Sequence, residues 1–307
     1  MKTVLLATEK PFTKETVNDI KDIIEKSGHK FKLLENYTDK QQLLDSIVDV
    51  DALIIRSDKI TKEIIEQAKN LKIIVRAGAG VDNVDLDAAT KNKIIVMNTP
   101  GQNANAVAEL VFGLLIFAIR NFYNGKTGTE LKGKKLGLLA FGQVGRNVAR
   151  IAKGFDMEIY SYDAFVPSKA IQQAGINPVD NQIELFKNCD IISLHIPATT
   201  ETIQSINYEL CSNMKKNAIL INTARKEVIN EKELIKLMEQ RPDLKYLTDL
   251  APDAHEEFKA KFEGRYFATP KKMGAQTEEA NINAGKAAAN QIIDYFSTGN
   301  RRFQVNK

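Results

Sequence analysis

The chain has 307 residues, of which 43% are hydrophobic and 27% charged, and its formal net charge is +4. This is the composition of a globular protein long enough for two domains, and no apolar stretch is long enough to span a bilayer. Interleaved lysines and acidic residues argue against a nucleic-acid surface, and two isolated cysteines argue against a metal or redox site. We therefore expect a cytoplasmic protein with no metal, no membrane contact and no nucleic-acid partner.

The first hundred residues alternate between apolar segments and helical patterns, which is typical of a parallel sheet covered by helices. Gly78, Ala79 and Gly80 form a glycine turn directly after the fourth apolar segment. We predict strands at residues 3–7, 31–34, 52–55, 73–75 and 94–97, and helices at residues 17–24, 43–47, 64–68 and 84–89.

Pro100 and Gly101 stop the fifth of these strands and mark a predicted hinge. A long helix is predicted after it, over residues 104–122. Because this helix is apolar on nearly every side, we expect it to be buried on two sides, between domains or in a homodimer interface.

Residues 134–163 read as strand, glycine turn, helix, strand and terminal acid, the signature of a dinucleotide-binding unit. Gly142 and Gly145 would let backbone N–H groups approach a pyrophosphate at the helix N-terminus. Asp163, 18 residues after Gly145, would accept hydrogen bonds from a ribose diol and repel the extra phosphate of NADP. Ala140 stands where the pattern has its first glycine, so a purely structural glycine turn is the alternative. The position of Asp163 favours an NAD site.

The remaining chain again alternates, with strands predicted at residues 191–196, 218–221, 246–250 and 266–268 and a final helix at residues 278–295. We predict an α/β protein of two doubly wound parallel-sheet domains, Rossmann-like or flavodoxin-like, with a ligand cleft between them. The substrate-binding domain would comprise residues 1–102 and 275–307, and the NAD-binding domain residues 103–274.

Arg225 directly follows the apolar strand at residues 218–221, so it lies at a strand's carboxyl end, where α/β proteins gather their sites. Its planar guanidinium group can bind a carboxylate through a bidentate pair of hydrogen bonds and can polarise a carbonyl. The alternative is an ordinary surface arginine that precedes a helix.

Six blocks, which occur in order along the chain and together span about two thirds of it, resemble the D-isomer-specific 2-hydroxyacid dehydrogenase family. The blocks are RAGAGVDNVD (76–85), NTPGQNANAVAEL (98–110), GTELKGKKLGLLAFGQVG (128–145), CDIISLHIPATTETI (189–203), LINTARKEVINEKEL (220–234) and ATPKKMGAQTEEA (268–280). Within the family, IRSDK (55–59), the GAQTEEA segment and the final FQVNK favour a short-type member. Such a member would oxidise 3-phospho-D-glycerate with NAD in serine biosynthesis.

The resemblance also implies roles for individual residues. Arg225 would be the catalytic arginine, and the helix at residues 104–122 would serve a homodimer. The cofactor would be bound by Gly142, Gln143, Val144, Gly145, Asp163, His195, Pro197, Thr223, Ala224, Asp249 and Gly274. The substrate would be bound by Arg56, Ser57, Gly78, Ala79, Gly80 and Asn103.

Two departures from the family pattern concern proton transfer. The family's proton-donating histidine is absent, and either Lys271 or Lys272 stands in its place. Counting back from the GAQTEEA segment selects Lys272. No glutamate is in register for the acid that partners that histidine, and Asp253 and Glu256 are the possible substitutes. A lysine ordinarily titrates near pH 10.4, so as a base it would need desolvation, a nearby cation such as Arg225 and no acidic partner.

We therefore hypothesise that Lys272 is the acid–base group and that oxidation has an alkaline optimum. The alternative is that Lys272 only binds substrate charge while water carries the proton. Two other functions stay open: reduction of glyoxylate, hydroxypyruvate or D-lactate-type substrates, and NAD(H) sensing by a corepressor-like protein without turnover.

Overall fold

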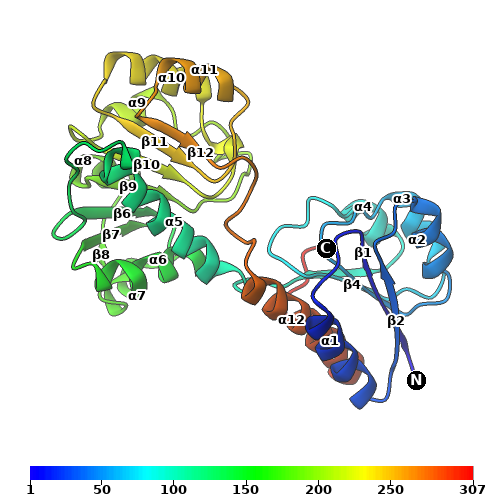
Figure 1. The fold of residues 1–307 in the computed structure, drawn as a ribbon. Helices are drawn as coiled ribbons and strands as arrows, with labels where there is room; N and C mark the ends of the chain where they lie inside the picture. The colour runs from blue at the N-terminus through cyan, green and yellow to red at the C-terminus, as the bar shows by residue number, and fades with distance from the viewer. Residues whose placement is uncertain (307) are drawn as a thin grey trace. The chain divides into compact units, whose positions relative to one another are not determined.

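A computed structural model describes residues 1–306 (Figure 1). The chain divides into two compact units: Met1–Asn103 with the segment from Thr277 onward, and Ala104–Gln276. The predicted domains divide the chain at 102/103 and 274/275. Among residues 1–306, no helix is both long enough and apolar enough to cross a membrane.

The first unit is built on a five-stranded parallel sheet in the order β2-β1-β3-β4-β5. Its strands are β1 (Thr3–Thr8), β2 (Lys30–Glu35), β3 (Ala52–Ile55), β4 (Ile73–Arg76) and β5 (Ile95–Asn98). Its helices are α1 (Lys14–Lys26), α2 (Lys40–Ile47), α3 (Lys62–Gln67), α4 (Leu86–Lys91) and α12 (Glu278–Thr298).

Both faces of this sheet are covered, which is why its central strands are continuously apolar. All four residues of β3 are buried. Helices α1 and α12, far apart in sequence, pack against each other on one face, and α2, α3 and α4 cover the other (Figure 1). The C-terminal tail returns to β5, where the buried Asn306 side chain accepts from the N–H of Val96 at 2.8 Å and donates to the carbonyl of Ile94 at 2.9 Å.

The second unit is built on a seven-stranded parallel sheet in the order β12-β11-β10-β9-β6-β7-β8. Its strands are β6 (Lys135–Leu139), β7 (Glu158–Tyr162), β8 (Asn177–Pro178), β9 (Ile191–Leu194), β10 (Ile219–Asn222), β11 (Lys245–Thr248) and β12 (Tyr266–Ala268). Its helices are α5 (Ala104–Ile119), α6 (Gln143–Gly154), α7 (Ser168–Gln173), α8 (Gln182–Asn188), α9 (Tyr208–Ser212), α10 (Glu231–Gln240) and α11 (His255–Lys261), with short 3₁₀ turns η1 (Asn121–Tyr123) and η2 (Lys226–Val228).

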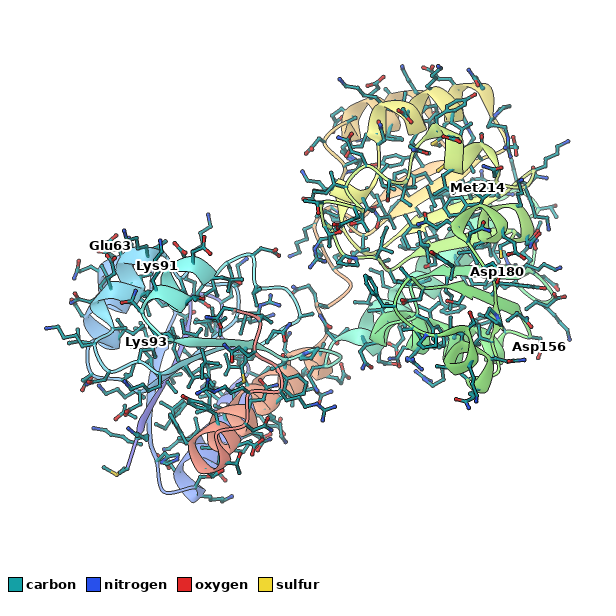
Figure 2. All side chains as sticks on the ribbon, turned by 180° about the vertical axis from the view of Figure 1, so that it is seen from behind. Glu63, Lys91, Lys93, Asp156, Asp180 and Met214 are labelled. Atoms are coloured by element: carbon teal, nitrogen blue, oxygen red, sulfur yellow. The ribbon has the colours of Figure 1, made fainter. Side chains whose placement is uncertain are left out.

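Helices α5, α6 and α7 pack on one face of this sheet and α8 to α11 on the other, so each unit is a three-layer, doubly wound structure. Figure 2 shows side chains filling both interiors. Of those labelled there, Met214 belongs to the core of the second unit, and Glu63 and Asp156 are exposed. The predicted fold class is confirmed.

One predicted helix is too long. Helix α5 ends at Ile119, three residues before the predicted end at Phe122. Asn121, Phe122 and Tyr123 all have positive φ, near 50°, which no right-handed helix accommodates. The physical reason is distant in sequence: the Lys245 ammonium group donates to the carbonyl of Ala118 at 2.8 Å, satisfying a carbonyl that a longer helix would have bonded internally.

Candidate functional site

The turn between β6 and α6 has the geometry of an anion-binding helix N-terminus. Gly142 is the N-cap of α6, no side chain caps the first turn, and a Cβ at Gly142 would meet no atom within 4 Å. The first N–H groups of α6 therefore face open space, as a pyrophosphate requires. A Cβ at Gly145 would lie 2.4 Å from the carbonyl oxygen of Ala140, so only glycine fits there.

Ala140 occupies the place of the pattern's first glycine and adopts φ of 84°. A left-handed alanine costs about 1–2 kcal/mol, so the turn keeps the glycine-like conformation against the preference of its own side chain. Ala140 therefore departs from the sequence pattern but leaves the backbone path of the glycine turn unchanged.

Asp163 follows β7 directly and is held by backbone donors. Its Oδ2 accepts from the N–H of Phe141 at 2.7 Å, and its Oδ1 accepts from those of Phe165 and Val166 at 2.8 and 2.9 Å. Burial alone would raise the pKa of Asp163, but these three donors and nearby Arg146 outweigh it and leave the pKa below its usual value. The carboxylate stays ionised and keeps acceptor capacity on Oδ2.

His195 lies behind the glycine turn, with its Cδ2 3.8 Å from the position of a Cβ on Gly145. Its Nε2 is 3.0 Å from the Oγ of Ser193, which is buried. Desolvation lowers the pKa of His195 to about 3, so the ring is neutral at physiological pH. Pro197, two residues further on, is exposed.

A small pocket at the carboxyl ends of β10 and β11, too narrow to admit a water molecule, brings together residues from three separate blocks of the sequence. The neighbouring strands bring their ends together because they are parallel. The pocket is lined by Asn222, Thr223, Ala224, Arg225, Thr248, Asp249, Leu250 and Lys272. Lys272, and not Lys271, is among them.

Arg225 is held by the turn that leaves β10. Buried Asn222 donates from Nδ2 to the carbonyl of Arg225 at 2.8 Å and accepts from the N–H of Ala224 at 3.0 Å. The Arg225 guanidinium group donates to the carbonyl of Ala224 at 3.0 Å. No carboxylate within residues 1–306 lies in ion-pair distance of it, so its charge is available to an anionic ligand.

Asp249 is buried and accepts three hydrogen bonds from the segment that carries the two lysines. Its Oδ1 accepts from the hydroxyl of Thr269 at 3.1 Å and from the N–H of Met273 at 2.8 Å, and its Oδ2 accepts from the N–H of Gly274 at 2.7 Å. A Cβ at Gly274 would come within 2.7 Å of Oδ2. The predicted cofactor residues Asp249 and Gly274 therefore contact each other.

Neither candidate for the missing acid lines the pocket. Asp253 forms an ion pair with Lys226, and its side chain is 79% exposed. The side chain of Glu256 is 86% exposed and 3.8 Å from His255. His255 itself starts α11 and has its Nδ1 2.8 Å from the hydroxyl of Tyr266. The structure thus places all three outside the group formed by Arg225 and Lys272.

In the first unit, the predicted substrate residues gather at the carboxyl ends of β3 and β4. Arg56 is the first residue after β3, packs over the Phe12 ring at 5.5 Å and precedes exposed Ser57. Burial lowers the pKa of the Arg56 guanidinium group, and Asp58 acts in the opposite direction. Gly78, Ala79 and Gly80 follow β4, and Asn103 is the last residue before α5.

Arg76, the last residue of β4, is a neighbour that the sequence prediction missed. Its Nε donates to the carbonyl of Arg56 at 2.8 Å, and its guanidinium group folds over Gly78, whose φ is 154°. A Cβ on Gly78 would lie 1.8 Å from Nη1 of Arg76, so a larger residue there would displace the guanidinium group from its present position. Arg76 follows an apolar strand as Arg225 does, and the same signal would have found it.

The residues present fit a dinucleotide. Besides the open space at Gly142, the Oγ1 atom of Thr223 is buried in the pocket without a hydrogen-bond partner. A buried polar atom without a partner is costly and marks a place where a ligand can bond. A larger depression, about 920 Å³, lies over η2, α10 and α11, but it holds none of the predicted site residues and its Lys226 and Asp253 pair with each other.

Comparison with known proteins gives one family match, that of the D-isomer specific 2-hydroxyacid dehydrogenase, NAD binding domain, over residues 118–263. A hydroxypyruvate reductase of Thermotoga maritima is 41% identical over 217 residues, covering 66% of this chain and 70% of that protein. A D-3-phosphoglycerate dehydrogenase of Methanocaldococcus jannaschii is 39% identical over 272 residues, 82% of this chain and 51% of that protein. The chain spans about half the length of the curated D-3-phosphoglycerate dehydrogenases that it matches.

Among solved structures, the NAD⁺-bound 3-phosphoglycerate dehydrogenase of Entamoeba histolytica is 48% identical, with a TM-score of 0.89 over 100% of this chain and 99% of that one. An acyclic imino acid reductase in complex with NADPH and D-Arg is 26% identical, with a TM-score of 0.78 over 99% of each chain. The family resemblance predicted from the six sequence blocks is confirmed.

Proposed function

Because this chain belongs to the D-isomer-specific 2-hydroxyacid dehydrogenase family, we propose that it is an NAD-dependent D-3-phosphoglycerate dehydrogenase. It oxidises 3-phospho-D-glycerate to 3-phosphohydroxypyruvate, the first step of the phosphorylated route to serine. The observation that carries the proposal is the pocket that joins Thr223, Arg225 and Lys272. NAD is the cofactor named for the family's domain, and when bound it supplies the acceptor for the substrate's hydride.

The chain's residues contact three parts of the bound cofactor: the pyrophosphate, the adenosine ribose and the nicotinamide. The N–H groups of α6 hold the pyrophosphate beside Gly142, Gln143, Val144 and Gly145. Asp163 accepts a hydrogen bond from the adenosine ribose through its remaining capacity on Oδ2. The Thr223 hydroxyl and Ala224 line the nicotinamide end of the cofactor. The neutral His195 ring packs behind the glycine turn between β6 and α6.

Arg225 and Lys272 carry the chemistry on the substrate. Arg225 binds the carboxylate and the carbonyl oxygen that forms at C2, because a planar guanidinium group can donate two parallel hydrogen bonds. Lys272, in its neutral amine form, accepts the proton of the C2 hydroxyl at Nζ and returns it in the reverse direction.

The first unit contributes the substrate's other contacts. The backbone of Gly78, Ala79 and Gly80 binds the carboxylate, while Arg56, Ser57 and Asn103 serve the far end of the substrate. Arg56 and Arg76 lie at one sheet edge, and we infer that their guanidinium groups donate charge-assisted hydrogen bonds to the substrate's phosphate group. We also place the protein in the cytoplasm as a homodimer that uses α5.

Steady-state NADH formation tests this function with a panel of 3-phospho-D-glycerate, D-glycerate and D-lactate. The phosphorylated acid should have by far the highest kcat/KM, because only it engages the arginines of the first unit. A preference for reducing glyoxylate or hydroxypyruvate would instead assign the reductase function. Binding of NADH without oxidation of any of these acids would assign the sensor function.

Replacing Asp163 by alanine should move cofactor preference towards NADP. The change removes a negative charge and frees the N–H groups of Phe141, Phe165 and Val166 beside Arg146, a set of donors suited to a 2′-phosphate. We expect kcat/KM for NADP to rise about tenfold or more while that for NAD falls, as one charged contact is exchanged. Asp156→Ala, an exposed acid before the same strand, is the control and should change neither value.

A further inference from the structure

Asp249 is bonded to both ends of one loop. The donors to its carboxylate are Thr269, the first residue of the segment after β12, and Met273 and Gly274, at the segment's end. A carboxylate this deeply buried is stable only when donors replace its lost hydration. These three donors belong to one six-residue stretch, which we call the lysine loop (residues 269–274).

The start of the lysine loop is fixed a second time. The N–H of Thr269 donates to the carbonyl of Thr248 at 3.1 Å, which extends the pairing of β11 with β12. The Thr269 hydroxyl shares its one hydrogen between the carbonyl of Lys271 at 2.8 Å and Asp249 Oδ1 at 3.1 Å. The loop therefore has anchored ends, and Pro270, Lys271 and Lys272 lie between them.

Anchoring both ends fixes where Lys272 stands. Asp249 directly follows β11, and Arg225 lies just past the end of the neighbouring strand β10. A loop tied to Asp249 carries its lysine at a constant place relative to Arg225, and both side chains line the same pocket. An acid–base group is effective only when it is held within hydrogen-bond reach of the proton that it transfers.

We propose that Asp249 is a positioning residue, whose carboxylate ties the lysine loop to the end of β11 and so holds Lys272 beside Arg225. This inference rests on the proposed function, in which Lys272 moves the proton. It assigns Asp249 a task in proton transfer that is separate from any contact with the nicotinamide. It also fits an aspartate at this position, because these three partners are all donors and a carboxyl group offers two acceptor oxygens.

Thr269→Val tests the inference without touching Asp249 itself. Valine has nearly the shape of threonine and removes the hydroxyl donor, so the hydrogen shared between Asp249 and the carbonyl of Lys271 is lost. Gly274→Ala is a second variant, since its methyl group would push against Asp249 Oδ2. Thr298→Val is the matched control: its hydroxyl donates to Asp294 at 2.9 Å at the exposed end of α12.

The first readout is amide hydrogen exchange of the lysine loop in the protein without ligands. Thr269→Val and Gly274→Ala should speed exchange at Met273 and Gly274 by about tenfold, the effect expected for a weakened charge-assisted bond, and the control should not. Unchanged exchange in both variants would overturn the positioning role.

The second readout is a double-mutant cycle on kcat. Thr269→Val should lower kcat about tenfold in the wild-type background and have no further effect in the Lys272→Ala background, with the Kd for NADH constant. An equal loss in both backgrounds, or a matching loss of NADH affinity, would mean that Asp249 acts on the cofactor and would refute the inference. A wild-type protein that oxidises no 2-hydroxy acid would instead refute the proposed function, together with the catalytic role of the loop.

Discussion

Lys272→Ala is expected to lower kcat for oxidation of 3-phospho-D-glycerate by about 10²–10⁴-fold, the usual contribution of a positioned acid–base group. Lys272 lines the pocket with Arg225, and neither His255 nor the acids near it does so. The Kd for NADH, measured by fluorescence titration, should barely change, because the pyrophosphate and ribose contacts lie on α6 and Asp163.

Lys271→Ala is the matched control for this variant. The two lysines are adjacent and exposed, but Lys271 does not line the pocket. We expect nearly wild-type turnover from Lys271→Ala. If both variants lost activity to the same extent, the lysines would act through their summed charge, and if Lys272→Ala kept full turnover, water would carry the proton.

The pH profile gives an independent test of Lys272. A lysine ordinarily titrates near pH 10.4, so the neutral amine becomes more abundant as pH rises and kcat for oxidation should climb on the alkaline side of neutrality. In the direction of reduction the ammonium form is needed, so activity should be retained at lower pH. The alkaline rise should disappear in Lys272→Ala.

Sequence reasoning succeeded where the signal is local along the chain. Asp163 and Arg225 each follow an apolar strand, and the carboxyl end of a parallel strand is the same edge of the sheet for both. The position of each residue directly after a predicted strand was therefore enough to place its backbone at that edge of the sheet. The alternation of elements likewise sufficed for the fold class, since strands buried on both faces have few other arrangements.

The features that the sequence did not predict share one physical cause: each depends on a side chain that contacts a partner far away in sequence. Lys245 ends α5 through a carbonyl more than a hundred residues earlier, and the bonds from Asp249 to the lysine loop span 20 residues or more. No periodicity encodes such contacts, because they depend on which strands are neighbours and on rotamers. Arg76 is different, because its position directly after an apolar segment could have been recognised in the sequence. The family resemblance pointed to the adjacent glycine turn at residues 78–80 and not to Arg76.

Arg225→Lys should be nearly as damaging as removal of the side chain, with kcat/KM falling by about 10²–10³-fold, the effect of losing one preorganised donor to a developing oxyanion. The charge remains, but an ammonium group cannot donate two parallel bonds to a carboxylate and a carbonyl. The turn is already fixed by Asn222 through the backbone of residues 224 and 225, so the loss is in the side chain and not in the fold.

Two further measurements separate geometry from charge at this position. Guanidinium ion added to Arg225→Ala should restore part of the turnover, whereas ammonium ion should not, because only the first reproduces the planar donor set. Lys226→Ala is the neighbouring control: it removes a cation that pairs with exposed Asp253, and an ion pair at the surface contributes about 1 kcal/mol or less. If Arg225→Lys kept wild-type kcat/KM while Lys226→Ala lost it, the substrate carboxylate would bind one residue further along the turn, and the depression over η2 would be the substrate site.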